Sequence, residues 1–197
     1  MSGFLISCAI RQVGELRRMV DEFSSFARLP KPLFRGEDPV DLARQALFLQ
    51  EVAHQEINFV FVADVDLGII ACDRHQFGQA MTNVLKNAVE AIEARQKLED
   101  ETWRGRIAVT LTCGPEDVMV SVADNGIGLP QDRERIVEPY VTTREKGTGL
   151  GLAIVNKIVE EHGGEMSFAA DEPDGTLVTM RFARDPLESR RGSEAAD

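Results

Sequence analysis

The sequence predicts an α+β fold: a two-layer α/β sandwich whose mixed sheet carries helices on one face, preceded by one long helix. Two alternating apolar runs, Ile107–Thr112 and Val118–Ala123, flank a Gly-Pro turn and are typical of a β-hairpin. Segments with helical periodicity separate further strand-like runs. Helices that alternate with hairpin-linked strands favour a sheet covered by helices over an all-helical or all-β domain.

The first expected helix spans Ile10–Ala27, where apolar residues recur every three or four positions. Pro30 and Pro32 end it, because the residue before a proline avoids helical backbone angles. One helix cannot bury its apolar seam alone, so we expect it to pack on the domain or on another chain. A second helix is predicted from the capping pair Asp38-Pro39 to about Val52.

The rest of the chain alternates between strands and helices. We expect strands at Ile57–Ala63, Gly68–Cys72, Met166–Ala169 and Leu177–Phe182, and helices at Asp73–Gln96 and Leu152–His162. Residues 124–151 are predicted to form a loop interrupted by glycines. These boundaries divide the chain into a helical segment at 1–30, a globular domain at 31–184, and a polar tail at 185–197 that we expect to be disordered.

The composition of the chain excludes several classes of function. The formal net charge of the 197 residues is −11, and such a chain has no basic stripe for nucleic acid. The three cysteines are widely spaced, which suits a reducing compartment. The sequence has no apolar run of membrane-spanning length, and its first residues lack the features of a signal peptide. We therefore expect a cytoplasmic fragment, whose parent protein could still be anchored in the inner membrane.

Two asparagines mark the helix predicted at Asp73–Gln96. At 100° per residue, Asn83, Asn87 and Glu90 fall within an arc of about 60°. The opposite side carries apolar residues: Val84, Leu85, Ala88, Val89 and Ile92. A plain solvated face would use better helix formers than asparagine. Amide oxygens also suit Mg²⁺, which takes its other ligands from water and substrate phosphates.

Two glycine-rich segments follow. DNGIGLP, residues 124–130, comes directly after an apolar strand, so Asp124 should lie at the strand end. A simple turn explains this segment about equally well. KGTGLGLAIV, residues 146–155, places alternating glycines immediately before a helix, where backbone N–H groups favour an anion such as a polyphosphate. Thr142, Thr143, Arg144 and Lys146 add hydroxyls and positive charge just upstream.

In this order, the three elements resemble the ATP-binding domain of sensor histidine kinases, whose Bergerat-type fold is shared with gyrase, Hsp90 and MutL. NVLKNAVEAIE is similar to the N box, DNGIGLP to the first glycine box, EPYVTTREKGT to the lid and GTGLGLAIV to the second glycine box. The resemblance covers about residues 33–183. The preceding IRQVGELRRMVDEFSSFARLPKP resembles the second dimerisation helix of nitrogen-regulation kinases of the NtrY/NtrB type.

The resemblance implies roles for individual residues. Asn87 with Asn83 would hold Mg²⁺ against the ATP phosphates, and Asp124 would accept a hydrogen bond from the adenine amino group. Gly126 and Gly128 would admit the base, and Thr176 would lie near it. The residues expected to contact the phosphates are Thr142, Thr143, Arg144, Lys146, Gly147, Thr148, Gly149, Leu150 and Gly151. Asn83, Asn87 and Lys146 would assist phosphoryl transfer, and the segment 138–146 would act as a lid.

The chain departs from a complete kinase of this family. Its histidines, His54, His75 and His162, lie outside the first helix and lack the sequence context of a phosphate acceptor. We expect the acceptor to lie on a helix outside this chain, so the fragment would not phosphorylate itself. The expected partners are ATP, that histidine-bearing helix in a homodimeric full-length kinase, and a response regulator that receives the phosphoryl group on an aspartate.

Two other functions compete with phosphotransfer. An ATPase of the same fold would place a carboxylate one turn before the magnesium asparagine, but Asn83 occupies that position and cannot accept a proton. Glu90, one turn after Asn87, is a poor substitute, and many relatives carry lysine there. A non-catalytic interaction module is the second alternative, since the apolar seam of the first helix is suited to binding a partner.

Overall fold

The computed structural model describes residues 13, 14, 17, 20, 24, 29–100, 102–129, 149–171 and 174–187. Its elements, in chain order, are β1 (Arg35–Glu37), α2 (Pro39–Ala53), β2 (Asn58–Ala63), β3 (Ile70–Cys72), α3 (Arg74–Gln96), β4 (Arg106–Cys113), β5 (Asp117–Asp124), α4 (Gly151–Glu161), β6 (Met166–Ala170) and β7 (Thr176–Ala183). No helix in these ranges is both long enough and apolar enough to cross a lipid bilayer.

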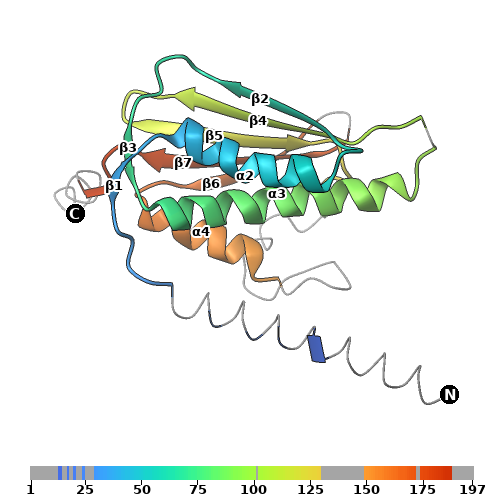
Figure 1. Ribbon diagram of the computed structural model, residues 1–197, viewed down its shortest axis with the longest axis horizontal. Helices are drawn as coiled ribbons and strands as arrows, with labels where there is room; N and C mark the ends of the chain where they lie inside the picture. Colours follow the sequence, from blue (N-terminus) through green and yellow to red (C-terminus); the bar gives the residue numbers. More distant parts are fainter. Residues whose placement is uncertain are drawn as a thin grey trace.

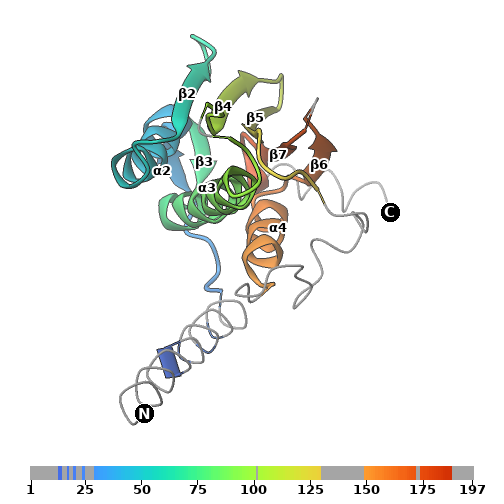
Figure 2. The ribbon, with the colours of Figure 1, turned by 90° about the vertical axis from the view of Figure 1, so that its right-hand side faces the viewer.

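A five-stranded sheet in the order β2-β4-β5-β7-β6 forms one layer. β2 runs parallel to β4, and the other neighbouring strands are antiparallel. Figures 1 and 2 show α2, α3 and α4 side by side on one face of this sheet, with α3 between the other two. The predicted α+β class, the mixed sheet and the helices on one face are confirmed.

The core lies between the sheet and α3. The five apolar residues predicted on one side of α3 are each at most 3% exposed. They meet the inward-facing side chains of β4 and β5, whose burial alternates as expected for strands with one covered face. The opposite, asparagine side of α3 lies toward the start of α4, where Asn83 is hydrogen-bonded to Gly151.

Two aspartates determine where α2 and α3 begin. Asp38 caps α2, and its Oδ1 accepts a hydrogen bond from the N–H of Val40 (2.8 Å). Asp73 caps α3, and its Oδ1 accepts from the N–H groups of His75 (2.9 Å) and Gln76 (3.1 Å). These carboxylates satisfy backbone donors that have no partner within the helix. The predicted starts of both helices are confirmed.

The structure differs from the expected elements at the start of the domain. The strand expected at Gly68–Cys72 begins only at Ile70, since Gly68 has a left-handed backbone (φ +68°). That strand, β3, pairs with the three-residue β1 in a separate two-stranded sheet, and the sequence pattern did not predict β1. Of the first expected helix, the described residues are helical, and Val13 and Val20 from its seam are 65% and 60% exposed.

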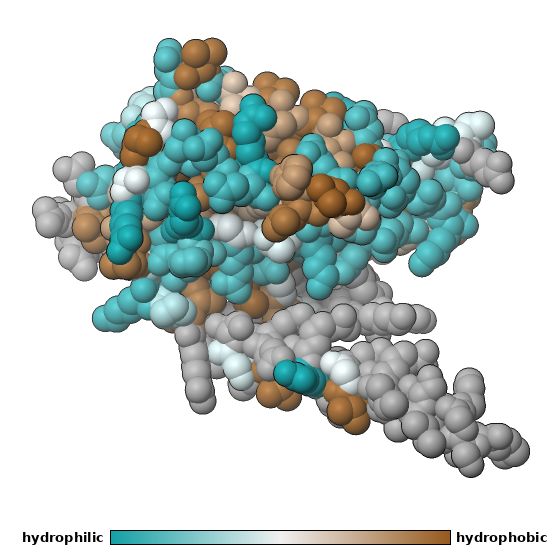
Figure 3. All heavy atoms as spheres, viewed as in Figure 1, coloured by the Kyte–Doolittle hydropathy of each residue, from teal (hydrophilic) through white to brown (hydrophobic). Residues whose placement is uncertain are grey.

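Apolar side chains also gather on the outer surface over α2 (Figure 3). Phe48, Leu49 and Val52 in its C-terminal half are each more than half exposed, whereas Leu42 and Leu47 of the same helix are buried. α2 therefore contributes apolar residues both to the core and to the surface.

Candidate functional site

The asparagine side of α3 faces the start of α4. Asn83, Asn87 and Glu90 are half-buried along this side, as their spacing predicts. The Nδ2 of Asn83 donates a hydrogen bond to the carbonyl oxygen of Gly151 at 3.4 Å. Because the side-chain nitrogen of Asn83 is engaged in this hydrogen bond, its side-chain oxygen, Oδ1, is the atom that can bind a cation.

The N-terminus of α4 differs from those of α2 and α3. Its N-cap residue is Leu150, which makes no side-chain capping hydrogen bond, whereas α2 and α3 are each capped by an aspartate. Leu150 is 1% exposed, and its hydrocarbon side chain has no acceptor for the first N–H groups of the helix. Gly149 before it has φ +69°, and a Cβ placed on Gly151 would meet no heavy atom within 4 Å. The helix start therefore combines backbone donors with open space, which suits an anionic ligand.

Asp124 lies at the end of β5, as its position after an apolar strand predicted. It is 5% exposed, and its Oδ1 accepts a hydrogen bond from the N–H of Gly126 at 2.8 Å. Gly126 packs directly on α3: a Cβ there would lie 2.6 Å from the backbone carbon of Ala91. The N–H of Ile127 also donates to the carbonyl oxygen of Ala91 (3.2 Å). This turn is thus tied to the same helix that carries the asparagines.

Thr176 lies directly across from Asp124. The two residues are partners in the antiparallel register of β5 and β7, and both are buried. Gly175 precedes Thr176, and a Cβ at Gly175 would lie 2.0 Å from the carbonyl oxygen of Asp124, so only glycine fits. Gly128 lies nearby with φ +75°, a left-handed conformation that favours glycine. The structure therefore places Thr176 beside the first glycine box.

Asn125, between Asp124 and Gly126, has a structural role that the sequence did not indicate. Its Oδ1 accepts from the N–H of Arg106 (2.7 Å), and its Nδ2 donates to the carbonyl oxygen of Arg104 (3.0 Å). The side chain fastens the turn to the segment that leads into β4. Both partners precede Asn125 by about 20 residues and belong to the backbone, so no motif in the sequence marks this role.

The described members of the predicted site converge on α3 from two directions. Asn83 is hydrogen-bonded to Gly151, which Gly149 and Leu150 directly precede, and Asn87 lies one turn further along α3. Asp124, Gly126, Gly128 and Thr176 meet at another part of the helix. Six predicted residues lie outside the described part of the chain, and their contributions stay predictions: Thr142, Thr143, Arg144, Lys146, Gly147 and Thr148.

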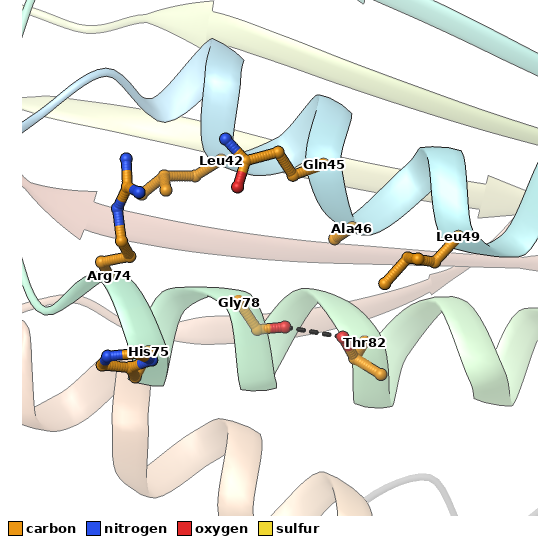
Figure 4. A pocket seen from close by; sticks show the side chains of 8 residues that line it. All are labelled: Leu42, Gln45, Ala46, Leu49, Arg74, His75, Gly78 and Thr82. Atoms are coloured by element: carbon orange, nitrogen blue, oxygen red, sulfur yellow. Dashed lines mark hydrogen bonds between the residues drawn. The ribbon is translucent and has the colours of Figure 1, made fainter.

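A cavity of about 380 Å³ lies elsewhere, between α2 and α3. Figure 4 shows Leu42 and Leu49 on the side of α2 and Arg74, His75 and Thr82 on the side of α3. None of the described members of the predicted site lines this cavity, which is therefore distinct from the contact between α3 and α4.

The histidines in the described residues occupy structural or surface positions. His162 is fully buried; its Nε2 accepts from the N–H of Asp73 (3.0 Å), and its Nδ1 lies 2.7 Å from the carbonyl oxygen of Ile158. Those contacts assign the proton to Nδ1 and join the end of α4 to the start of α3. His54 is the C-cap residue of α2, and His75 is exposed in the first turn of α3.

Comparison with known proteins places this arrangement in a family. The family model described as histidine kinase-, DNA gyrase B- and HSP90-like ATPase matches residues 72–186. The chain is 54% identical, over 175 residues, to the nitrogen regulation protein NtrY of Azorhizobium caulinodans. That alignment covers 88% of this chain and 22% of the relative, so the chain spans about a fifth of the relative's length.

Solved structures show the same fold. The catalytic domain of the histidine kinase ThkA superposes with a TM-score of 0.66 at 32% identity, covering 79% of this chain and 99% of that domain. The complex of ThkA with the response regulator protein TrrA matches with a TM-score of 0.73 at 26% identity, covering 93% of this chain and 52% of the solved one.

Proposed function

The chain belongs to the histidine kinase-, DNA gyrase B- and HSP90-like ATPase family, as a histidine kinase catalytic domain, and on this premise we propose that it binds Mg-ATP between the asparagine side of α3 and the start of α4. In the proposed reaction the γ-phosphoryl group passes to a histidine on a dimerisation helix of the full-length kinase. An aspartate of a response regulator would then receive it, in a nitrogen-related signalling pathway. The similarity to a nitrogen regulation protein and to a histidine kinase solved with a response regulator supports this pathway.

The observation that carries the proposal is the contact between the asparagine side of α3 and the start of α4. A leucine N-cap leaves the first N–H groups of α4 without a side-chain acceptor from that residue, and Asn83 is hydrogen-bonded to the first residue of the helix. Neutral amide oxygens beside backbone N–H donors fit a magnesium-bound polyphosphate. In a chain of net charge −11, such local donors are needed to hold an anion.

In this mechanism the residues position charge and do little covalent chemistry. Asn87 and Asn83 would offer their amide oxygens to Mg²⁺, which would offset the charge on the phosphates when bound. The N-terminal amides of α4 would hold the phosphate oxygens. Asp124 would accept a hydrogen bond from the adenine amino group, with its carboxylate oriented by the N–H of Gly126. The cations Arg144 and Lys146 are proposed to approach the γ-phosphate.

A trans-phosphorylation assay tests this proposal. The chain would be incubated with γ-labelled Mg-ATP and a full-length kinase of the NtrY type that retains its acceptor histidine but cannot bind ATP. We expect label on the acceptor that is labile in acid and stable in alkali, as a phosphohistidine is. Release of inorganic phosphate without labelled acceptor would favour the ATPase alternative. Absence of both products would favour an interaction module.

A further inference from the structure

Arg95 lies in the last turn of α3, outside every motif that the sequence identified. Its guanidinium contacts two loops that are far apart in sequence. Nη1 donates to the carbonyl oxygens of Asn125 (3.1 Å), Gly126 (3.4 Å) and Asp174 (3.2 Å). Nη2 lies 3.3 Å from Oδ2 of the Asp174 side chain. One side chain thus fastens the turn after β5 to the turn before β7.

These two turns carry the residues proposed to bind adenine. Asp124 is the last residue of β5 and Gly126 lies on the first turn, whereas Thr176 begins β7 directly after the second turn. The register pairs Asp124 with Thr176 at the place where β5 ends and β7 begins. A change in the separation of the two turns would therefore move the carboxylate and the threonine relative to each other.

The surroundings of Arg95 keep its side chain in one orientation. Its Nε is 2.8 Å from Oε1 of Glu99, and its guanidinium carbon lies 5.4 Å from the ring centre of Trp103. The side chain is only 18% exposed. Arginine presents several donors in a planar fork, so it can bond several carbonyl oxygens at once, which a lysine ammonium does with less geometric precision.

We propose that Arg95 is a positioning residue for adenine recognition, which sets the spacing of the Asp124 and Thr176 turns without touching the nucleotide. This inference rests on the proposed function, because it assumes that adenine binds between those turns. It predicts that loss of Arg95 weakens binding of the base more than binding of the phosphates, and reduces the preference for adenine over guanine.

Trp103 provides a built-in reporter. It is the only tryptophan in the chain, and its ring lies beside Arg95. Nucleotide that binds between the two turns should change the fluorescence of Trp103 through this contact. The same titration can then be repeated on variants, with calorimetry as an independent measure of affinity.

The test compares Arg95→Met and Arg95→Lys with the wild-type chain. We expect Arg95→Met to weaken binding of a non-hydrolysable ATP analogue and of adenosine by a similar factor, about tenfold, and to lower the ATP-to-GTP preference. Arg95→Lys should retain part of the affinity and part of the ATP-to-GTP preference. Simple loss of a positive charge would instead weaken the triphosphate and leave adenosine unchanged, and that outcome would overturn the inference.

Two matched controls separate positioning from general damage. Arg181→Met removes an exposed arginine that pairs with Asp117 at the other end of β5 (3.5 Å). Asp174→Asn removes only the exposed ion pair and keeps the backbone carbonyl that Arg95 binds. Both should retain wild-type affinity and ATP-to-GTP preference. If circular dichroism shows that Arg95→Met does not fold, the ATP-to-GTP preference of Arg95→Lys decides the test. A preference equal to that of the wild-type chain overturns the inference.

The outcomes also distinguish this inference from the proposed function. If the wild-type chain binds no ATP analogue, both are overturned. If the wild-type chain binds the analogue and folded Arg95→Met binds it equally well with the same base preference, only the role of Arg95 is overturned.

Discussion

The side chain of Asn83 and the backbone carbonyl of Gly151 are hydrogen-bonded at 3.4 Å, although 68 positions separate them in the sequence. This contact joins the asparagine side of α3 to the start of α4. It brings two groups of different chemistry together: amide oxygens, which suit a cation, and backbone N–H groups, which suit an anion. A magnesium-bound phosphate chain needs both.

Removal of Asn87 should abolish the effect of magnesium. In the wild-type chain we expect Mg²⁺ to strengthen binding of an ATP analogue by about tenfold or more, and in Asn87→Ala by less than about twofold. Purine binding should persist, because Asp124 is untouched. Calorimetric titrations with and without Mg²⁺ measure both quantities. Thr82→Ala, on the exposed side of α3, is the control and should keep the wild-type magnesium effect. Full magnesium dependence in Asn87→Ala would place the metal elsewhere.

Replacement of Asp124 by asparagine should weaken ATP binding while the turn stays folded. The amide oxygen can still accept from the N–H of Gly126, but it replaces a charged acceptor for the adenine amino group by a neutral one. In the wild-type chain, GTP should bind more weakly than ATP by ~1.5–3 kcal/mol, about 10- to 100-fold, since its O6 would face the carboxylate. Competition binding measures both effects. Equal affinity of the wild-type chain for the two nucleotides would contradict the assignment of Asp124.

Two glycines of the site should respond differently to alanine. Gly151→Ala should fold normally, since its Cβ would meet no heavy atom within 4 Å, yet it should weaken ATP binding by adding a methyl group at the start of α4. Gly126→Ala should destabilise the fold by about 1–3 kcal/mol, because its Cβ would lie 2.6 Å from α3 backbone at Ala91. Urea unfolding and ATP titration separate the two effects.

Gly78→Ala supplies the control for the glycine pair. Gly78 lies within α3, and a Cβ there would also meet nothing within 4 Å. Alanine should stabilise the helix by about 0.5–1 kcal/mol without changing ATP affinity. Gly151→Ala with wild-type affinity would argue against phosphates at the start of α4.

Asp73 should make stability depend on pH below neutrality. Burial acts to raise the pKa of its carboxyl, but three backbone N–H groups, foremost that of Leu33, hold it below the ordinary value of 3.8. The stabilisation is therefore fully present above the unfolded-state pKa and is lost as pH falls through the lower folded-state value. Asp73→Asn keeps a capping oxygen but no charge. Its stability deficit relative to wild type should shrink as pH falls from about 5 toward 3. A constant deficit in urea unfolding would contradict this account.

The cysteines should differ in reactivity. Cys72 is fully buried, and burial, with a smaller effect of the Glu37 charge, raises the pKa of its thiol to about 12. Cys113 is exposed, and Arg184 Nη2 lies 2.7 Å from its sulfur. In a Cys8→Ser background, a maleimide should modify Cys113 at pH 7.5 and Cys72 only after denaturation. Cys113→Ser should abolish the fast reaction. Rapid modification of Cys72 in the folded chain would refute the buried assignment.

The helices and strands whose apolar residues recur with a clear period could be predicted from the sequence. The spacing of Asn83, Asn87 and the apolar residues between them predicts both faces of α3, and the alternation in β4 and β5 predicts their hairpin. The sequence could not predict β1, because this strand has three residues after a proline-rich linker, too few to show an alternation of apolar and polar side chains. Nor could it predict that β2 pairs with β4 in parallel, since α3 separates the two strands.

The same limit applies within the site. Motifs identify side chains that would face the ligand, such as Asp124. Residues that hold the site together bind backbone carbonyls of distant segments, and backbone groups leave no signature in a sequence. Arg95 reaches a carbonyl 79 positions away, and Asn125 reaches one 21 positions away. Such partners become visible only once the chain is folded.

Binding of a non-hydrolysable ATP analogue to the purified chain, measured by calorimetry with and without Mg²⁺, tests the central claim most directly. The account predicts saturable binding to one site per chain, strengthened by Mg²⁺ and accompanied by a change in Trp103 fluorescence. Absence of binding at millimolar analogue, with or without the metal, would contradict it.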